Sequence, residues 1–368
     1  MGKVSKEAVL EALSQVNDPD LGKDLVSLKM IEEIEISDKL ISFNVVLTTP
    51  ACPLKDKIES DCIEAIHQTI GDDFEVAVHF SSQVTSKRID KKDLLPGVKN
   101  IIAVASGKGG VGKSTVAVNL AIALAQNGSS VGLIDADIYG PSVPLMMGIK
   151  GQRPGVEKID DKHFIIPIEK YGVKILSIGL LIDDRQAVVW RGPMVASALK
   201  QFVTDCIWGE LDYLVLDMPP GTGDIHLSLV QTVPVTGAVI VTTPQDVALD
   251  DARKAISMFR MPNIDVPVLG VVENMSYFTP PELPDKKYYI FGQAGGKQLA
   301  DEYDLPLLGE IPIVEDIREN SQQEKPVVLG TNEKLKTAFM QFAVNTEQQV
   351  AIRNAKSEPT KTVETAST

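Results

Sequence analysis

The first eighty residues show two kinds of apolar spacing. Residues 5–16 and 53–71 carry apolar side chains at helical intervals, which predicts two amphipathic helices. Residues 30–36 and 40–47 alternate apolar and polar side chains on either side of a short polar turn, and residues 74–80 follow the second helix as a further strand. The pattern therefore predicts a small α+β domain over residues 1–80.

The pattern changes after a polar and charged stretch, residues 81–98, which contains Pro-Gly and is typical of a linker. Short apolar runs then alternate with helix-length segments. The runs read "IIAVA", "SVGLID", "VKILSIG", "DYLVLD", "GAVIVTT" and "VPVLGVV". Continuous rather than alternating runs indicate strands buried on both faces, so residues 99–350 are predicted to form an α/β domain with a mostly parallel sheet covered by helices. Residues 351–368 lack apolar spacing and are predicted to be a disordered tail.

The segment "GKGGVGKS" fits the phosphate-loop pattern and stands between a predicted strand and a predicted helix. Glycines let backbone amides approach phosphates, and the helix N-terminus adds its positive dipole. Lys113 is expected to reach the β- and γ-phosphates of ATP, and Ser114 to hold Mg²⁺. The residues predicted to bind the nucleotide here are Gly107, Lys108, Gly109, Gly110, Val111, Gly112, Lys113, Ser114 and Thr115.

Aspartates close two of the later apolar runs. Asp135 and Asp137 follow "SVGLI", and Asp217 follows "DYLVL" ahead of a glycine-rich turn. Ligands of open parallel sheets bind at the carboxyl ends of the strands. Asp217 is therefore a candidate for the Walker-B role of polarising the Mg²⁺ shell. For one of the pair Asp135 and Asp137, capping of the next segment is an alternative interpretation; for both together it is disfavoured.

Composition and charge disfavour several kinds of partner and a disulfide-stabilised fold. The formal net charge of -14 over 368 residues disfavours nucleic acid as a partner. No apolar run reaches the ~20 residues of a membrane helix, and we expect a cytoplasmic protein without a membrane partner. Three cysteines are too few for a disulfide framework.

The phosphate loop contains a second lysine, Lys108, five residues before Lys113. "KGGVGKST" resembles the deviant Walker A motif of dimeric ATPases that include nitrogenase reductase, the arsenite-pump ATPase, and the Min and Par ATPases. In those families the early lysine crosses the dimer interface to the partner's nucleotide. The resemblance thus implies a homodimer in which Lys108 acts in trans, where such a charge is worth ~10³–10⁵ in rate.

Further motifs resemble the Mrp/ApbC family of iron–sulfur cluster carriers. They read "DADIYGPSVPLMMG", "WRGPM", "DYLVLDMPPGTGD", "TTPQDVALDDARKAISMF", "GVVENMSYF" and "LLGEIPIVEDIREN". "DPDLGKDLVSLKMI" and "TTPACP" are similar to a domain found in iron–sulfur assembly factors. The resemblance implies slow ATP hydrolysis and transfer of a cluster to apoproteins, with assembly factors as further partners. It also implies that Asp137 positions the attacking water and that Asn274 and the backbone near Pro312 face the adenine.

The chain departs from this family at the cluster ligands. Carriers have a C-x-x-C pair shortly after "ENMSYF", and here Thr279, Pro280, Pro281 and Glu282 occupy that region. Cys62 and Cys206 stand among apolar residues and are predicted to be structural. Cys52 precedes a proline suited to the first position of a helix, where a thiol pKa is lowered, so Cys52 is the candidate iron–sulfur ligand.

Three functions fit these observations. The first is an ATPase that carries iron–sulfur clusters. The second is an ATP-dependent assembly adaptor without its own cluster. The third is a nucleotide-switched positioning ATPase of the Min/Par kind, which the net charge and the absence of a basic amphipathic C-terminal helix disfavour.

Overall fold

The structure of the chain, a computed structural model, describes residues 4–88, 95–181, 192–280, 282–283, 285–314, 317 and 324–360. Trp190, Arg191 and Pro281 of the motifs above, parts of "LLGEIPIVEDIREN" and the last eight residues of the predicted tail lie outside the described residues. The chain divides into two compact units. The first comprises Met1–Thr85 with Ala351–Ser357, and the second Ser86–Val350 with Glu358–Thr368.

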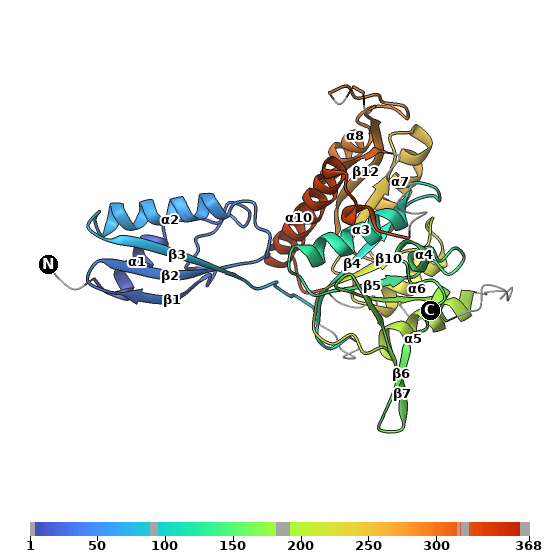
Figure 1. Cartoon of the computed structure of the whole chain (residues 1–368), viewed down its shortest axis with the longest axis horizontal. Coiled ribbons are helices and arrows are strands. Elements are labelled where there is room, and N and C mark those ends of the chain that lie inside the picture. Colours follow the sequence, from blue (N-terminus) through green and yellow to red (C-terminus); the bar gives the residue numbers. More distant parts are fainter. Residues whose placement is uncertain are drawn as a thin grey trace. The chain divides into compact units, whose positions relative to one another are not determined.

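The first unit contains the five predicted elements. They are α1 (Lys6–Leu13), β1 (Ile31–Ile36), β2 (Leu40–Leu47), α2 (Lys55–Thr69) and β3 (Glu75–Ser82). The central strand β2 pairs antiparallel with β1 and parallel with β3. Every second residue of β2 is buried and packs with the apolar faces of α1 and α2 in one core. The strands and helices of this unit are labelled in Figure 1. The α+β fold predicted from the alternation is confirmed.

The second unit is built on an eight-stranded sheet of order β13-β12-β11-β4-β10-β5-β9-β8. Its strands are β4 (Val98–Ala105), β5 (Val131–Asp135), β8 (Ile168–Lys170), β9 (Val173–Ser177), β10 (Leu211–Asp217), β11 (Gly237–Thr242), β12 (Val268–Phe278) and β13 (Leu307–Ile313). All neighbours pair in parallel except the edge strand β8, which is antiparallel to β9. The mostly parallel sheet predicted from the apolar runs is confirmed.

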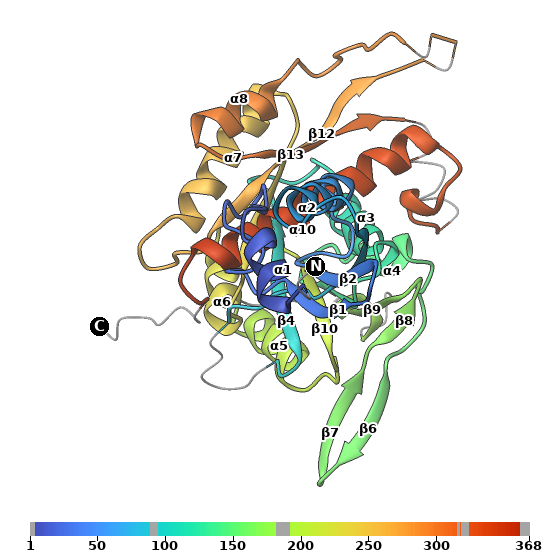
Figure 2. The same cartoon turned by 90° about the vertical axis from the view of Figure 1, so that its left-hand side faces the viewer.

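Helices cover both faces of this sheet (Figure 2). They are α3 (Lys113–Gln126), α4 (Val143–Met146), η1 (Ile178–Leu180), α5 (Gly192–Thr204), α6 (Asp224–Thr232), α7 (Asp246–Phe259), α8 (Gly295–Glu302), η2 (Val327–Leu329) and α10 (Glu333–Lys356). Buried residues of α5 to α8 share one core with one face of the central strands. α3 contacts β4, β5 and β10 outside that core and so lies on the opposite face.

The strand order places three functional segments side by side. β10 lies between β4 and β5, so Asp217 at its end is in register with Val104 on one side and Asp135 on the other. The loop after β4 is the predicted phosphate loop. After β10 the chain continues to β11 on the far side of β4, and ligands bind at such reversals of strand order.

The structure corrects two predicted boundaries, that of the C-terminal tail and that of the linker. The tail does not begin at residue 351, because α10 continues to Lys356. Arg353 and Asn354 are buried there, and Asn354 Nδ2 donates to the Thr85 carbonyl at 3.0 Å, so polar contacts replace the apolar spacing that the prediction required. β3 likewise extends to Ser82, two residues into the predicted linker. A hairpin of β6 (Gly155–Ile159) and β7 (Lys162–Ile166), which no sequence pattern predicted, projects from the domain (Figure 2).

Candidate nucleotide site

The loop between β4 and α3 is held closely by two neighbouring elements. A Cβ on Gly107 would lie 2.0 Å from the backbone oxygen of Asp251 in α7. Gly112, the N-cap of α3, has φ +81°, and a Cβ there would lie 2.2 Å from Asn274 Nδ2. Glycine is therefore required at both positions, by contact at the first and by contact and backbone conformation at the second.

Hydrogen bonds fix the path of this loop. Ser106 Oγ donates to the Lys108 carbonyl at 2.9 Å, and the Gly221 amide donates to the Ser106 carbonyl at 3.0 Å. Asn274 Nδ2 donates to the Val111 carbonyl at 2.8 Å, so Asn274 lies against the loop itself. Its predicted role at the adenine stays a prediction, as does that of Pro312, which lies in β13.

Lys113 and Asp217 form a buried ion pair beneath the loop. Lys113 is 6% exposed, Asp217 is 0% exposed, and Lys113 Nζ donates to Asp217 Oδ1. Lys113 Nζ also donates to Ser114 Oγ at 3.2 Å. Burial raises the pKa of Asp217, and the Lys113 charge works against that rise. The charge of Lys113 is thus neutralised by Asp217, the candidate Walker-B carboxylate.

The same residues offer oxygen ligands for Mg²⁺. Asp217 Oδ2 is buried and has no hydrogen-bond partner among the described residues, and the Ser114 hydroxyl lies beside the same lysine. A carboxylate and a hydroxyl are the hard ligands that this cation takes in proteins, usually together with waters and phosphate oxygens. The residues present therefore fit the ion, and Ser114 and Asp217 would hold it.

Two further carboxylates belong to the segment after β5. Asp137 is half-buried, and burial raises its pKa while Lys113 opposes the rise. Asp135 is fully buried; burial, and then the Asp217 charge, raise its pKa to about 8. Asp135 accepts a hydrogen bond from Ser177 Oγ, a residue that no sequence motif identified as functional.

A hollow of about 210 Å³ lies beside these groups. Most of the phosphate loop lines it, and Asp137, Ser142 and Met146 lie along its wall. Lys108 and Lys113 both line this hollow, and Lys108 is half-buried. Backbone amides at a helix N-terminus with two lysines form a site for a polyphosphate. The structure thus brings together Lys108, Lys113, Ser114 and Asp137 as the sequence predicted, with Asp217 ion-paired to Lys113.

The cysteines do not form a comparable centre. Cys62 and Cys206 are buried, as predicted, and burial raises the pKa of each thiol to about 12. The prediction of a lowered Cys52 pKa is wrong. α2 begins at Lys55 with Leu54 as N-cap, so Cys52 precedes the helix, and partial burial raises its pKa more than the Leu54 amide lowers it.

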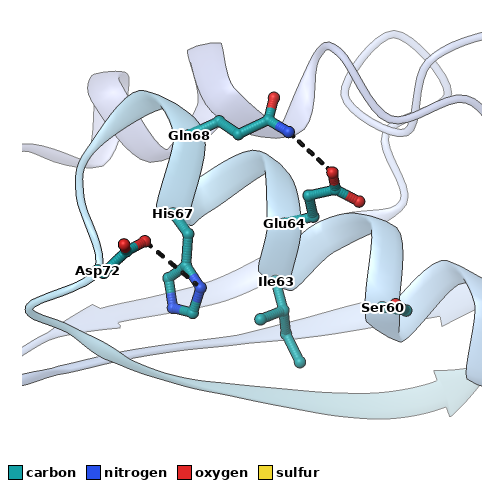
Figure 3. A pocket seen from close by; sticks show the side chains of 6 residues that line it. All are labelled: Ser60, Ile63, Glu64, His67, Gln68 and Asp72. Atoms are coloured by element: carbon teal, nitrogen blue, oxygen red, sulfur yellow. Dashed lines mark hydrogen bonds and ion pairs between the residues drawn. The ribbon is translucent and has the colours of Figure 1, made fainter.

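A larger hollow of about 560 Å³ lies on α2 in the first unit (Figure 3). Gln68 Nε2 donates to Glu64 Oε1 at 2.8 Å, and His67 Nδ1 lies 3.9 Å from Asp72 Oδ1. No cysteine lines it, and its polar side chains approach one another, Gln68 and Glu64 within α2 and His67 and Asp72 at the end of the helix. This hollow supplies no thiolate for a cluster.

The strand–loop–helix geometry, the buried Lys113–Asp217 pair and the carboxylates beside them define the second unit as a P-loop nucleotide-hydrolysing domain. Residues 97–347 match the family described as NUBPL iron-transfer P-loop NTPases, and residues 6–80 match the family described as iron–sulfur cluster assembly proteins. The chain belongs to the iron-transfer P-loop NTPase family and is an ATPase. The predicted fold class and family are confirmed.

Known relatives cover nearly the whole chain. An iron–sulfur cluster carrier protein from Deinococcus radiodurans is 51% identical, over 96% of this chain and 98% of its own. A protein of the same name from Synechocystis is 48% identical, over 90% of this chain and 93% of its own. A nucleotide-binding protein from Archaeoglobus fulgidus, solved in complex with ADP, is 38% identical with a TM-score of 0.56, over 64% of this chain and 92% of its own.

The described residues include no helix that is both long and apolar enough to cross a membrane.

Proposed function

We propose that this protein is an ATP-dependent carrier that accepts an iron–sulfur cluster and passes it to apoproteins in the cytoplasm. The observation that carries the proposal is the joining of two matches in one chain, an iron–sulfur assembly domain and an iron-transfer NTPase domain. The names of the Synechocystis and Deinococcus relatives support the same function.

The ATPase cycle follows from the site. Lys113 and the loop amides hold the β- and γ-phosphates, and Ser114 and Asp217 would hold Mg²⁺, which when bound neutralises charge developing on phosphate oxygens. Asp137, on the wall of the hollow, orients the attacking water. Lys108 acts on the nucleotide of a second subunit, so the active form is a homodimer. The half-buried position of Lys108 at the hollow supports a role at phosphate, and the deviant motif supports its action in trans.

The cargo is held weakly in this chain. A [4Fe–4S] cluster takes four thiolates, and no cysteine follows Cys206. Cys62 and Cys206 are buried, and only Cys52 is half-buried. A cluster that uses Cys52 must therefore share ligands with other proteins or with non-cysteine groups. Such sharing favours transfer over storage.

Anaerobic reconstitution with iron and sulfide tests the carrier function. We expect a colourless protein as purified and a labile cluster after reconstitution, measured by iron content and the visible absorption spectrum. Cys52→Ser removes the cluster, and Cys206→Ser, the matched control, retains it. Because the pKa of Cys52 is raised, proton competition weakens ligation, and iron retention increases between about pH 7 and pH 9. A stable brown protein whose spectrum survives Cys52→Ser would contradict the role of Cys52.

One observation favours a second candidate function, an adaptor that lacks its own cluster. Within the part of the chain that the structure describes, no three His, Cys, Asp or Glu side chains are arranged to hold a metal ion. A protein that hydrolyses ATP but takes up no iron on reconstitution would support the adaptor and exclude the carrier.

A further inference from the structure

The carboxylate of Asp135 accepts hydrogen bonds on both oxygens. This residue ends β5 and is 0% exposed. Its Oδ1 accepts from the Asp137 amide at 3.2 Å. Its Oδ2 accepts from Ser177 Oγ at 2.9 Å and from the Val143 amide at 3.3 Å. One buried side chain therefore contacts the segment after β5 at two backbone amides.

The first of these amides belongs to a residue that lines the nucleotide hollow, and the second is adjacent in sequence to one that does. Asp137 lines the hollow, and Val143 begins α4, where Ser142 and Met146 line it too. The Asp135 carboxylate ties both ends of this wall to the last residue of a central strand. Movement of the Asp137 backbone away from the phosphate loop would break the first of these bonds.

Ser177 determines where the Asp135 carboxylate points. It lies directly across from Asp135 in the parallel register of β5 and β9 and is 0% exposed. Its oxygen accepts from the Gly179 amide at 3.1 Å, while its only proton is donated to Asp135. The hydroxyl is thus fixed from both sides, and the adjacent strand holds the carboxylate in one rotamer.

We propose that Ser177 and Asp135 form a clamp that positions Asp137 for ATP hydrolysis. Both are positioning residues, since Ser177 acts through Asp135 and Asp135 acts through the Asp137 backbone. The inference rests on the proposed role of Asp137 at the attacking water. Neither Ser177 nor Asp135 is needed for a contact to phosphate. The clamp explains why these two polar side chains are nevertheless buried side by side in the sheet.

The test compares Ser177→Ala with a matched control at the other end of β5. Ser129 is also a buried serine that donates to a buried carboxylate, with its Oγ 3.2 Å from Glu347 Oε1. In steady-state ATPase assays we expect Ser177→Ala to lower kcat about tenfold with KM changed less than about twofold, because a displaced catalytic group slows the chemical step and leaves binding intact. Ser177→Thr keeps the hydroxyl and recovers most of kcat, and Ser129→Ala has wild-type kcat.

Asp137→Ala, assayed in parallel, separates the clamp from the function on which it rests. If Asp137→Ala is inactive but Ser177→Ala has wild-type kcat, the clamp is wrong and the role of Asp137 stands. If Asp137→Ala turns over like the wild type, the role of Asp137 is wrong, and the clamp falls with it. Equal losses of kcat in Ser177→Ala and Ser129→Ala would also overturn the clamp, since any buried serine would then produce the effect.

Discussion

Replacing Lys113 by alanine tests the phosphate site most directly. A full charge about 4 Å from a phosphate oxygen is worth ~4 kcal/mol at an effective dielectric constant of about 20. Part of this is offset, because Lys113 pairs with Asp217 and must divide its hydrogen bonds between this carboxylate and the phosphate. A net loss of about 2–3 kcal/mol remains, close to that of a charged hydrogen bond, so ADP affinity falls about 30- to 150-fold.

The same substitution leaves Asp217 buried without its cation. Removing one partner of a buried pair costs about 3–5 kcal/mol. Burial already raises the pKa of Asp217, so the carboxyl can take up a proton and limit the loss. A carboxyl whose pKa is higher folded than unfolded opposes folding increasingly as pH rises from its unfolded toward its folded value. The Lys113→Ala variant is therefore less destabilised at about pH 5 than at about pH 8. Denaturant titration at both pH values measures the free energy of unfolding and so tests this difference.

A double variant separates the two effects on binding. Calorimetric titration with ADP in EDTA removes any contribution of the Mg²⁺ ligands. Adding Asp217→Asn to Lys113→Ala neutralises the unpaired carboxylate, so stability recovers while affinity stays low. If the double variant regains wild-type affinity, the loss arose from repulsion by Asp217 and not from a missing lysine–phosphate contact. Affinity within about threefold of the wild type in a folded Lys113→Ala protein would refute the phosphate role outright.

Two further predictions concern other charged groups. Lys108→Ala retains ATP binding but loses hydrolysis; mixed with Asp137→Ala, it forms dimers with one site intact and one doubly defective. Each mixed dimer then recovers about half of wild-type turnover, and no recovery despite subunit exchange would indicate action in cis. Burial raises the pKa of Glu347 to about 7, so wild-type stability declines as pH rises from about 4.5 to 7. Glu347→Gln removes that decline, for a relative gain of about 3 kcal/mol at pH 8; equal pH slopes in the two proteins would contradict the assignment.

Apolar pattern predicted those elements whose burial is regular. The runs at 101–105 and 212–217 are buried on both faces, and the alternation of β2 matches its half-buried position. β13 gave no clear signal, because Gly309, Glu310 and Pro312 interrupt its apolar positions. Every residue of β6 is exposed and β7 is only partly buried, at Phe164 and Ile165, so burial imposes no regular apolar period on this hairpin.

The residues of the site also fall into two groups. Some are placed by the local sequence, and others come together only through the order of strands in the sheet. The phosphate loop is contiguous in sequence, so its spacing alone placed Lys113 and Ser114. Ser177 contacts Asp135 only because β9 lies beside β5 in the sheet. The sequence of neither strand indicates which strand will be its neighbour. The wrong direction for the Cys52 pKa has a related origin. The helix start at Lys55 and the burial of the thiol are both set by tertiary packing.

The buried Lys113–Asp217 pair also links nucleotide binding to cation binding. While the pair is intact, Lys113 neutralises the charge of Asp217, and Asp217 therefore binds a cation only weakly. If Lys113 turns to a phosphate, Asp217 loses its cation while it stays fully buried beside the carboxyl of Asp135. The negative charge of Asp217 then needs another counter-charge. Burial makes an unbalanced carboxylate costly, so the phosphate-bound state favours a cation at Asp217 or a proton on it. By thermodynamic reciprocity we expect a cation at Asp217 to favour phosphate binding by Lys113 to the same degree, so that nucleotide and cation bind cooperatively.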